Sequence, residues 1–598
     1  MKPRKQEYKQ RTRSKPEEYD LLVLGSGTAG KLIAWTLAKA GMKIADIERK
    51  YVGGSCQNIA CLPSKNVIHS AKVASYFRRS EEFGITRENW QISMPAVRER
   101  RRHVDSVLAR VKAMRTDGWS KDDRIDKILF EAQLEKDAFF PRVMRPEESD
   151  PQVYVNEASN GIFSLLRKEY APKKQRAAAA VSRLLAVPGM LQLARANLTQ
   201  PIKLYAQLAI SAARHGDDLY TTSLITLADG LADVHRTRLV SARDGALKAL
   251  HDFADWLESR QETMPDWKPM GEAQYNSLLQ RVLLLPLKAR EVATLGEVEL
   301  VRYRALEGWL KNPGYASPDP ARAARVPKDQ AEFLAAYEAR LREITDFLAA
   351  NHLITIPSYM GPFQIRQLPE AFKPTSPGGF MNPPGLYDSD PTGFFFIPTY
   401  DPKSENFYIR AAIEDPRPIL GHEGIPGHFL QISIANHLKY EIRRQHVDNT
   451  FVEGWALYGE EMLMREGLYA DQSPSQGQVL RLSRYRAARI GVDVNLQTGR
   501  WTFSQAVDHF MEGGGLDREA ATGEAAGAAS NPSQKIGYMV GKWQIMRLLG
   551  RYRDAQGANF RLGEFHDRLI SYGSLPLSVI EWLMFDDDTS LRKAGAHR

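Results

Sequence analysis

Apolar residues recur at steps of three and four positions over most of the chain beyond Trp119. Such spacing places one apolar stripe on each helix and predicts a series of amphipathic helices that pack through those stripes. The pattern therefore predicts a mainly α-helical protein. The clearest examples are Lys127–Phe139, Ala177–Ala196, Leu204–Ala213, Leu219–Lys248 and Ala331–Ala350.

Segments of other composition interrupt the helical pattern. Proline-rich stretches at 263–270, 312–328 and 368–385 predict breaks between helices, because proline ends or kinks a helix. Residues 520–531 are rich in alanine and glycine, and we expect a turn there, before the last helices. The segment 393–400 (GFFFIPTY) is the best strand candidate in this part of the chain.

The first part of the chain has a different pattern. Tyr19–Leu24 is a short apolar run typical of a buried parallel strand. A glycine-rich turn follows, then a helical stretch from Lys31 to about Ala40 and a second strand near Lys43–Ile47. We therefore predict a small partial α/β segment of Rossmann-like type before a large helical domain. The expected divisions are a basic, disordered tail at 1–17, the α/β segment at 18–115 and the helical domain at 116–598.

Length and composition narrow the class of protein. A chain of 598 residues is too long to fold around one hydrophobic core, so two or more domains are expected. Its 43% apolar and 26% charged residues are typical of globular proteins. The net charge of +9 is mild for this length, so we expect no nucleic-acid partner. Charge or proline interrupts every apolar run, so we expect no membrane span. The basic N-terminus does not resemble a signal peptide, and a secreted disulfide-rich protein would have more than two cysteines. We therefore expect a cytoplasmic location. The oligomeric state stays open.

One short segment, His-Glu-Gly-Ile-Pro-Gly-His at 422–428, combines the residues of a metal-dependent hydrolase. Such enzymes hold zinc through imidazoles and often a carboxylate, and a neighbouring carboxylate acts as general base. His422 and His428 are six positions apart, which is about 240° around an unbroken helix and would separate them. A proline–glycine pair lies between them and predicts a helix break that returns His428 to the same side. Glu423 is then the candidate base.

A later helical segment, 451–461 (FVEGWALYGEE), offers the third ligand. Glu453 is the candidate, and Glu460 lies two turns further on the same face, where it can hydrogen-bond a ligand histidine. An isolated His-Glu pair is usually a surface feature, and Glu460 alone is equally explained as an exposed helix carboxylate. The occurrence of both segments in apolar surroundings favours a metal site of His422, His428 and Glu453.

The paired segments HEGIPGHFLQ and FVEGWALYGE resemble the bacterial domain-of-unknown-function family 885, whose members resemble gluzincin-type metallopeptidases. The resemblance covers about residues 118–590 and includes the segment 532–538 (PSQKIGY). It implies zinc on the two histidines and Glu453, with Glu423 as the general base. The family often has a second histidine where this chain has Phe429, which removes a polar neighbour but no ligand.

Two further side chains are candidates for binding the developing negative charge or a peptide carboxylate. Tyr538 and Arg547 offer donors of the kind that such sites place where charge develops. Core packing explains Tyr538 equally well, and a position on a helix surface explains Arg547. Together with the resemblance, these residues predict a zinc-dependent hydrolase that acts on small peptides or amides through metal-activated water.

A glycine motif marks the N-terminal segment. Gly25, Gly27 and Gly30 directly follow a predicted strand and open a predicted helix. In this context the three glycines allow a tight turn and the close approach of a pyrophosphate to the helix N-terminus. Glu48 falls near the end of the second strand, where a carboxylate can bind ribose hydroxyls. These four residues are the candidate cofactor-binding set.

Cys56 and Cys61 are the only cysteines of the chain and stand in the segment GGSCQNIACLPSK. With the glycine motif, this segment resembles the flavin-linked pyridine nucleotide–disulfide oxidoreductases, including dihydrolipoamide and mercuric reductases. The resemblance implies FAD and a redox disulfide between the two cysteines. The resemblance covers only about residues 18–112. FAD would therefore lack much of its binding pocket, and whether this segment binds FAD stays open.

Three hypotheses follow. The first is a zinc metallopeptidase or related amide hydrolase on a helical scaffold. The alternatives are an FAD-dependent disulfide oxidoreductase activity of the N-terminal part, or an inactive fusion of two truncated genes joined near residue 115.

Overall fold

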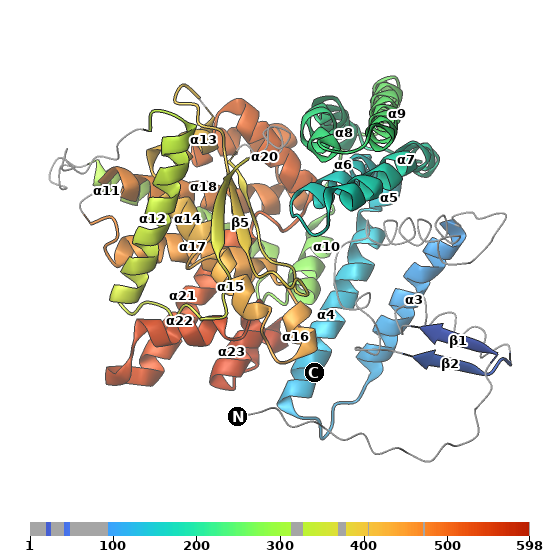
Figure 1. The fold of residues 1–598 in the computed structure, drawn as a ribbon. Coiled ribbons are helices and arrows are strands. Elements are labelled where there is room, and N and C mark those ends of the chain that lie inside the picture. Colours follow the sequence, from blue (N-terminus) through green and yellow to red (C-terminus); the bar gives the residue numbers. More distant parts are fainter. Residues whose placement is uncertain are drawn as a thin grey trace, which may run out of the picture. The chain divides into compact units, whose positions relative to one another are not determined.

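The computed structural model of the chain describes residues 20–24, 41–47, 94–311, 327–368, 378–404, 406–470 and 473–596. The chain divides into two compact units, Met1–Cys61 and Leu62–Arg598. In the first unit the strands β1 (Leu21–Leu24) and β2 (Ile44–Ile47) pair in parallel (Figure 1). Both strands fall where the sequence predicts them, and the helix predicted between them lies outside the described residues.

The second unit is built mainly of helices, as the apolar periodicity predicts (Figure 1). Its α-helices are α3 (Met94–Ala113), α4 (Lys121–Val143), α5 (Pro146–Ser149), α6 (Gln152–Leu166), α7 (Lys173–Asn197), α8 (Lys203–His215), α9 (Asp233–Glu258), α10 (Glu272–Ser277), α11 (Ala289–Leu310), α12 (Gln330–Ala350), α13 (Phe407–Glu414), α14 (Arg417–Glu423), α15 (His428–Ala435), α16 (Glu441–Gln445), α17 (Asn449–Arg465), α18 (Ser473–Gln497), α19 (Phe503–His509), α20 (Arg518–Ser530), α21 (Gly537–Gln556), α22 (Leu562–Ile570), α23 (Leu577–Phe585) and α24 (Thr589–Lys593).

Large clusters of buried apolar side chains join these helices. One cluster surrounds α14, α15 and α17, which carry the predicted metal ligands. A second lies between α11 and α18, and a third joins α6, α7, α8 and α9. The predicted site therefore lies within a packed core, where side chains are held in fixed positions.

A small mixed sheet covers part of this core. Its central strand β5 (Gly393–Ile397) pairs in parallel with β3 (Phe363–Gln367) and antiparallel with β4 (Phe380–Asn382). All five residues of β5 are buried, which explains why its sequence is a continuous apolar run rather than an alternating one. The strand predicted within 393–400 is confirmed.

Two expectations about helices are wrong, and the first concerns residues 520–531. Residues 520–530 belong to α20, which Asp517 caps by accepting a hydrogen bond of 2.8 Å from the backbone N–H of Ala520, and Asn531 is the C-cap. Alanine is the strongest helix former, and several alanines of α20 are buried in the cluster that also contains α18. The small side chains therefore serve close helix packing.

The second concerns Leu219–Lys248, expected as one helix. A π-helical and a 3₁₀ turn cover residues 219–228, and α9 begins only at Asp233. Gly230 has a φ of +78°, a left-handed conformation that separates the two parts. The apolar spacing is continuous across this break and does not reveal it.

Helix α7 resembles a membrane span in length and composition, although no such segment is expected from the sequence. Among the described helices it alone has the length and composition of one, with a mean hydropathy of 1.4 over its most apolar window. Alanine, valine and leucine side chains of α7 are nevertheless buried against its helical neighbours in the third cluster. Core helices of globular proteins have the same composition, so this feature alone implies no membrane.

Helices α17 and α21 cross at two glycines. A Cβ atom on Gly454 would lie 2.5 Å from the Cα of Gly541, and one on Gly541 would lie 1.9 Å from the carbonyl oxygen of Thr450. The backbones therefore touch, and no side chain fits between them. This contact sets the distance between Glu453 on α17 and Tyr538 on α21.

Replacement of Gly541 by alanine is expected to lower the free energy of unfolding by about 1–3 kcal/mol, because the added methyl group forces the two helices apart. Gly550→Ala is the matched control, because Gly550 lies in the same helix with nothing within 4 Å of its Cβ position. There the change should be neutral or stabilising by up to about 1 kcal/mol. Urea denaturation of both variants measures the difference, and equal stabilities would contradict the tight crossing.

Candidate metal centre

The break between α14 and α15 brings two histidines together. Helix α14 ends at Glu423 and α15 begins at His428, so the predicted helix interruption is confirmed. The turn doubles back so closely that a Cβ atom on Gly427 would lie 1.9 Å from the carbonyl oxygen of His422, a clash that glycine avoids. The imidazole rings of His422 and His428 consequently lie with their centroids 4.7 Å apart.

A tryptophan and a phenylalanine hold this turn between α17 and the sheet. Nε1 of the buried Trp455 donates a hydrogen bond of 2.8 Å to the carbonyl oxygen of Pro426, whose preceding peptide bond is cis. On the sheet side, Phe363 of β3 stacks on Phe429 of α15 with ring centroids 4.7 Å apart. Both contacts fix the positions of the two helix ends that carry the histidines.

Glu453 on α17 completes a set of three ligand-type atoms. Its Oε2 lies 3.4 Å from Nε2 of His422 and 3.3 Å from Nε2 of His428. Two ligands that each lie about 2.0–2.1 Å from a zinc ion at the tetrahedral angle are about 3.3–3.4 Å from one another. The distances from Glu453 Oε2 to the two imidazole nitrogens are therefore those expected between ligands of one zinc ion.

Burial and charge also fit a cation. Oε2 of Glu453 and Nδ1 of His428 are buried and form no hydrogen bond within the described part of the chain. Burial disfavours the imidazolium of His422, but the carboxylates of Glu453 and Glu460 outweigh it and raise its pKa to about 9. Burial likewise opposes ionisation of Glu453, yet the two imidazoles hold the pKa of its carboxyl well below its usual range. A buried carboxylate that faces two imidazoles is a donor set that suits a divalent metal.

Glu460 orients one of the two imidazoles. Its Oε1 lies 2.7 Å from Nδ1 of His422, and the Glu460 side chain is only 1% exposed. Once Nε2 of His422 gives up its proton to make room for a metal, the Nδ1–H donated to Glu460 keeps the Nε2 lone pair available for that metal. This is the arrangement in which a histidine can bind a metal through Nε2.

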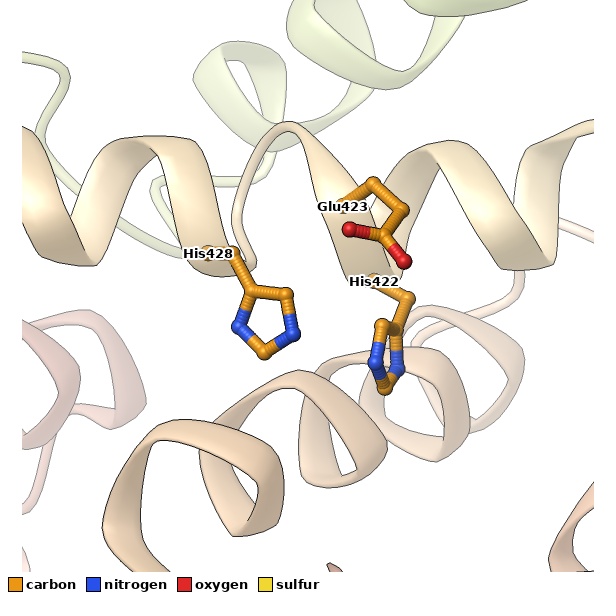
Figure 2. Close-up of side chains that lie close together, drawn as sticks. All are labelled: His422, Glu423 and His428. Atoms are coloured by element: carbon orange, nitrogen blue, oxygen red, sulfur yellow. The ribbon is translucent and has the colours of Figure 1, made fainter. Parts of the chain in front are cut away.

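Glu423 lies at the end of α14 beside the first histidine. One of its carboxylate oxygens and one ring nitrogen each of His422 and His428 lie within 4.8 Å of one another. Figure 2 shows the three side chains gathered at the break between the two helices. Glu423 is not in contact distance of both imidazoles as Glu453 is, so the geometry suits Glu453 as a ligand and Glu423 as a base.

Tyr538, on the first turn of α21, forms a wall of the site. Its ring stacks on the ring of His422 with centroids 6.2 Å apart and an angle of 18° between the planes. Its hydroxyl is 3.4 Å from Nε2 of Gln534, and burial raises the pKa of Tyr538, so the phenol keeps its proton. A protonated hydroxyl beside the three ligand-type residues can donate a hydrogen bond to an oxyanion.

Arg547 lies away from this cluster. It is exposed on α21, and its guanidinium carbon is 5.0 Å from the ring centroid of Trp543. Nine positions along a helix correspond to about 13 Å of rise and about 180° of rotation, which places Arg547 on the face opposite to Tyr538. The structure therefore does not bring Arg547 to the site.

Two arginines of α18, missed by the sequence analysis, lie against Tyr538 instead. The guanidinium carbons of Arg486 and Arg489 are 5.7 Å and 4.8 Å from the centroid of the Tyr538 ring. Both side chains are buried. Their position within a helix whose neighbouring residues are alanine, isoleucine and valine was the available sequence signal, because charged residues on such a face need a buried partner.

The predicted cofactor residues of the N-terminal segment, Gly25, Gly27, Gly30 and Glu48, lie outside the described residues, as do Cys56 and Cys61. Comparison with known proteins nevertheless supports the resemblance. A family model described as "Pyridine nucleotide-disulphide oxidoreductase" matches residues 19–135.

Curated relatives of this segment are dihydrolipoyl dehydrogenases. That of Chlamydia trachomatis serovar D is 38% identical over 96 residues, which is 16% of this chain and 20% of the relative. One from Bacillus subtilis is 35% identical over 92 residues, or 15% of this chain and 19% of the relative. The chain thus spans about a fifth of the length of the curated relatives it matches. Its N-terminal part resembles a portion of an oxidoreductase.

Solved structures resemble the chain over most of its length. A candidate lipoprotein of unknown function from Shewanella oneidensis has a TM-score of 0.66 at 20% identity, covering 88% of this chain and 100% of that one. A candidate lipoprotein from Colwellia psychrerythraea has a TM-score of 0.63 at 18% identity, covering 89% and 99%. At this identity the likeness concerns the fold. A family model matches residues 80–584, and the chain therefore belongs to the family described as "Bacterial protein of unknown function (DUF885)".

Proposed function

We propose that the helical part of the chain is a zinc-dependent hydrolase that acts on small peptides or amides. The observation that carries this proposal is the position of Glu453, whose Oε2 lies 3.3–3.4 Å from Nε2 of both His422 and His428 without a hydrogen bond. Three ligand-type atoms at this spacing, with a further carboxylate beside them, match the needs of a hydrolytic zinc site.

The residues around the site divide the work of amide hydrolysis. His422, His428 and Glu453 would hold the metal, which when bound polarises a carbonyl and lowers the pKa of a water. Glu423 accepts the proton that the attacking water loses and passes it to the leaving amine. Tyr538 donates a hydrogen bond to the oxygen on which negative charge develops.

Metal analysis tests this proposal directly. The full chain, stripped with a chelator and dialysed against zinc, is expected to retain one zinc ion, and His428→Ala is expected to retain none. Replacing both cysteines by serine in all proteins removes thiolates that also bind zinc. His103→Ala, which changes an exposed histidine on α3, is the control. Equal zinc content in the parent and in His428→Ala would rule out the site.

The N-terminal segment supports a second candidate function, a flavin-dependent disulfide oxidoreductase. The similarity of residues 19–135 to that family is the observation that favours it. In this candidate, Gly25, Gly27, Gly30 and Glu48 contact FAD, and Cys56 and Cys61 form the redox disulfide. The test is the visible absorbance of bound flavin in freshly purified protein, followed by NAD(P)H consumption. A colourless protein that does not bind added FAD would exclude this candidate.

A further inference from the structure

Arg486 is a buried cation whose carboxylate partner in the described part of the chain, Glu460, lies beyond hydrogen-bond distance. Its side chain is 8% exposed, and its Nε is enclosed without a hydrogen-bond acceptor in the described part of the chain. The nearest carboxylate oxygen is Oε1 of Glu460, at 3.6 Å, beyond hydrogen-bond distance. That oxygen already accepts the proton of His422 Nδ1 at 2.7 Å. A guanidinium has five donors, and enclosing it without acceptors is costly unless another anion binds there.

The neighbouring arginine shows the contrast. Arg489, three positions along α18, bonds both oxygens of Glu524 at 3.0 Å and also the hydroxyl of Tyr485. Nζ of Lys535 lies 2.9 Å from the same Glu524. Arg489 and Lys535 thus both bind Glu524, while Glu460, the carboxylate nearest to Arg486, hydrogen-bonds His422. Of these three cations, Arg486 is the one without a hydrogen-bonded carboxylate in the described part of the chain.

Arg486 also lies near the candidate metal centre. The guanidinium carbon of Arg486 is 5.7 Å from the centroid of the Tyr538 ring, which itself stacks on His422. Oε1 of Glu460 lies near both the guanidinium of Arg486, at 3.6 Å, and Nδ1 of His422, at 2.7 Å. Arg486 therefore borders the candidate metal centre on the side of Tyr538 and Glu460.

We propose that Arg486 binds the terminal carboxylate of the substrate, and that the substrates are short peptides or N-acyl amino acids with a free C-terminal carboxylate. This inference rests on the proposed hydrolase function and names its substrate class. The planar guanidinium can give a carboxylate two parallel hydrogen bonds, which an amide or ester terminus cannot receive in the same way. The enzyme then removes single C-terminal residues rather than cutting inside long chains.

Ligand binding to the metal-free protein tests the proposal independently of catalysis. The probes are N-acetylphenylalanine and N-acetylphenylalaninamide, titrated calorimetrically into the full chain after chelator treatment. The acid is expected to bind at least about tenfold more tightly than the amide, because only the acid forms charge-assisted bonds. In Arg486→Gln the two affinities should agree within about twofold. Arg342→Gln, an exposed change on α12, should keep the preference.

A second measurement guards against misfolding. Arg486→Met is expected to melt at the same temperature as the parent or higher, because it removes a buried charge whose carboxylate partner lies beyond hydrogen-bond distance. Arg489→Met should melt lower, since it removes the hydrogen bonds that Arg489 donates to both oxygens of Glu524 and to the hydroxyl of Tyr485. The opposite order would contradict the assignment of Arg486 as a binding rather than a structural residue.

Three results would overturn the proposal. They are equal affinities for acid and amide, no binding of either probe, and a preference that survives in Arg486→Gln. Tighter binding of N-acetylglutamic acid α-amide than of N-acetylphenylalanine would assign an acidic side chain to the subsite instead, and would also overturn it. A protein that binds no zinc would rule out the hydrolase function. The metal-free protein could still prefer the acid over the amide. A failure of the hydrolase proposal can therefore be told apart from a failure of the Arg486 proposal.

Discussion

Glu423→Gln is expected to slow peptide hydrolysis by about 10²- to 10⁴-fold while the zinc content stays at that of the parent. The amide has the size and shape of the carboxylate but cannot accept a proton from water. Glu453 already lies in contact with both imidazole Nε2 atoms, so the metal should not depend on Glu423. The measurement is steady-state hydrolysis of a blocked dipeptide alongside metal analysis of the same samples.

The control for this experiment is Glu338→Gln, which removes an exposed carboxylate of α12 and should change neither activity nor zinc content. The double readout separates two roles for Glu423. An activity loss with zinc retained identifies a base, whereas loss of both would show that Glu423 is a ligand in place of Glu453. Parental activity in Glu423→Gln would falsify the proposed mechanism.

The parts of the site that follow from local sequence could be predicted. His422, Glu423 and His428 lie within seven positions, and the glycine and proline residues between the histidines imply the helix break that brings them together. The place of Glu453 needed a second segment, but its helical context and its spacing to Glu460 left few alternatives. The strand β5 was equally clear, because five consecutive apolar or small residues allow burial on both faces.

The parts that depend on contacts between distant segments could not be predicted. Arg486 meets Tyr538 only because α18 packs beside α21, and nothing in either segment specifies that neighbour. Arg547 follows Tyr538 by nine positions in sequence, but helix geometry places it on the opposite face of α21. The misassigned residues 520–531 show the same limit, since an alanine- and glycine-rich stretch becomes a close-packed helix only where another helix covers it.

Glu453→Ala is expected to reduce zinc affinity by more than Glu460→Gln does, and the comparison tests which carboxylate contacts the metal. Loss of an outer carboxylate that orients a ligand histidine typically costs about 10- to 100-fold in affinity, so Glu460→Gln should fall in that range. Removal of a ligand itself should exceed about 100-fold, leaving Glu453→Ala without zinc at micromolar concentrations. Competition with a chromophoric chelator measures both affinities on the same scale.

The stability of the metal-free protein provides an independent readout for the same residue. In the absence of metal, the Glu453 carboxylate is, with that of Glu460, a buried counter-charge of His422, whose pKa is raised to about 9. Glu453→Ala should therefore destabilise the metal-free chain at neutral pH while abolishing the rise in melting temperature on adding zinc. A zinc-dependent rise that persists in Glu453→Ala would assign the third ligand elsewhere, and Glu423, which the described part of the chain places within 4.8 Å of both histidines, would be the next candidate.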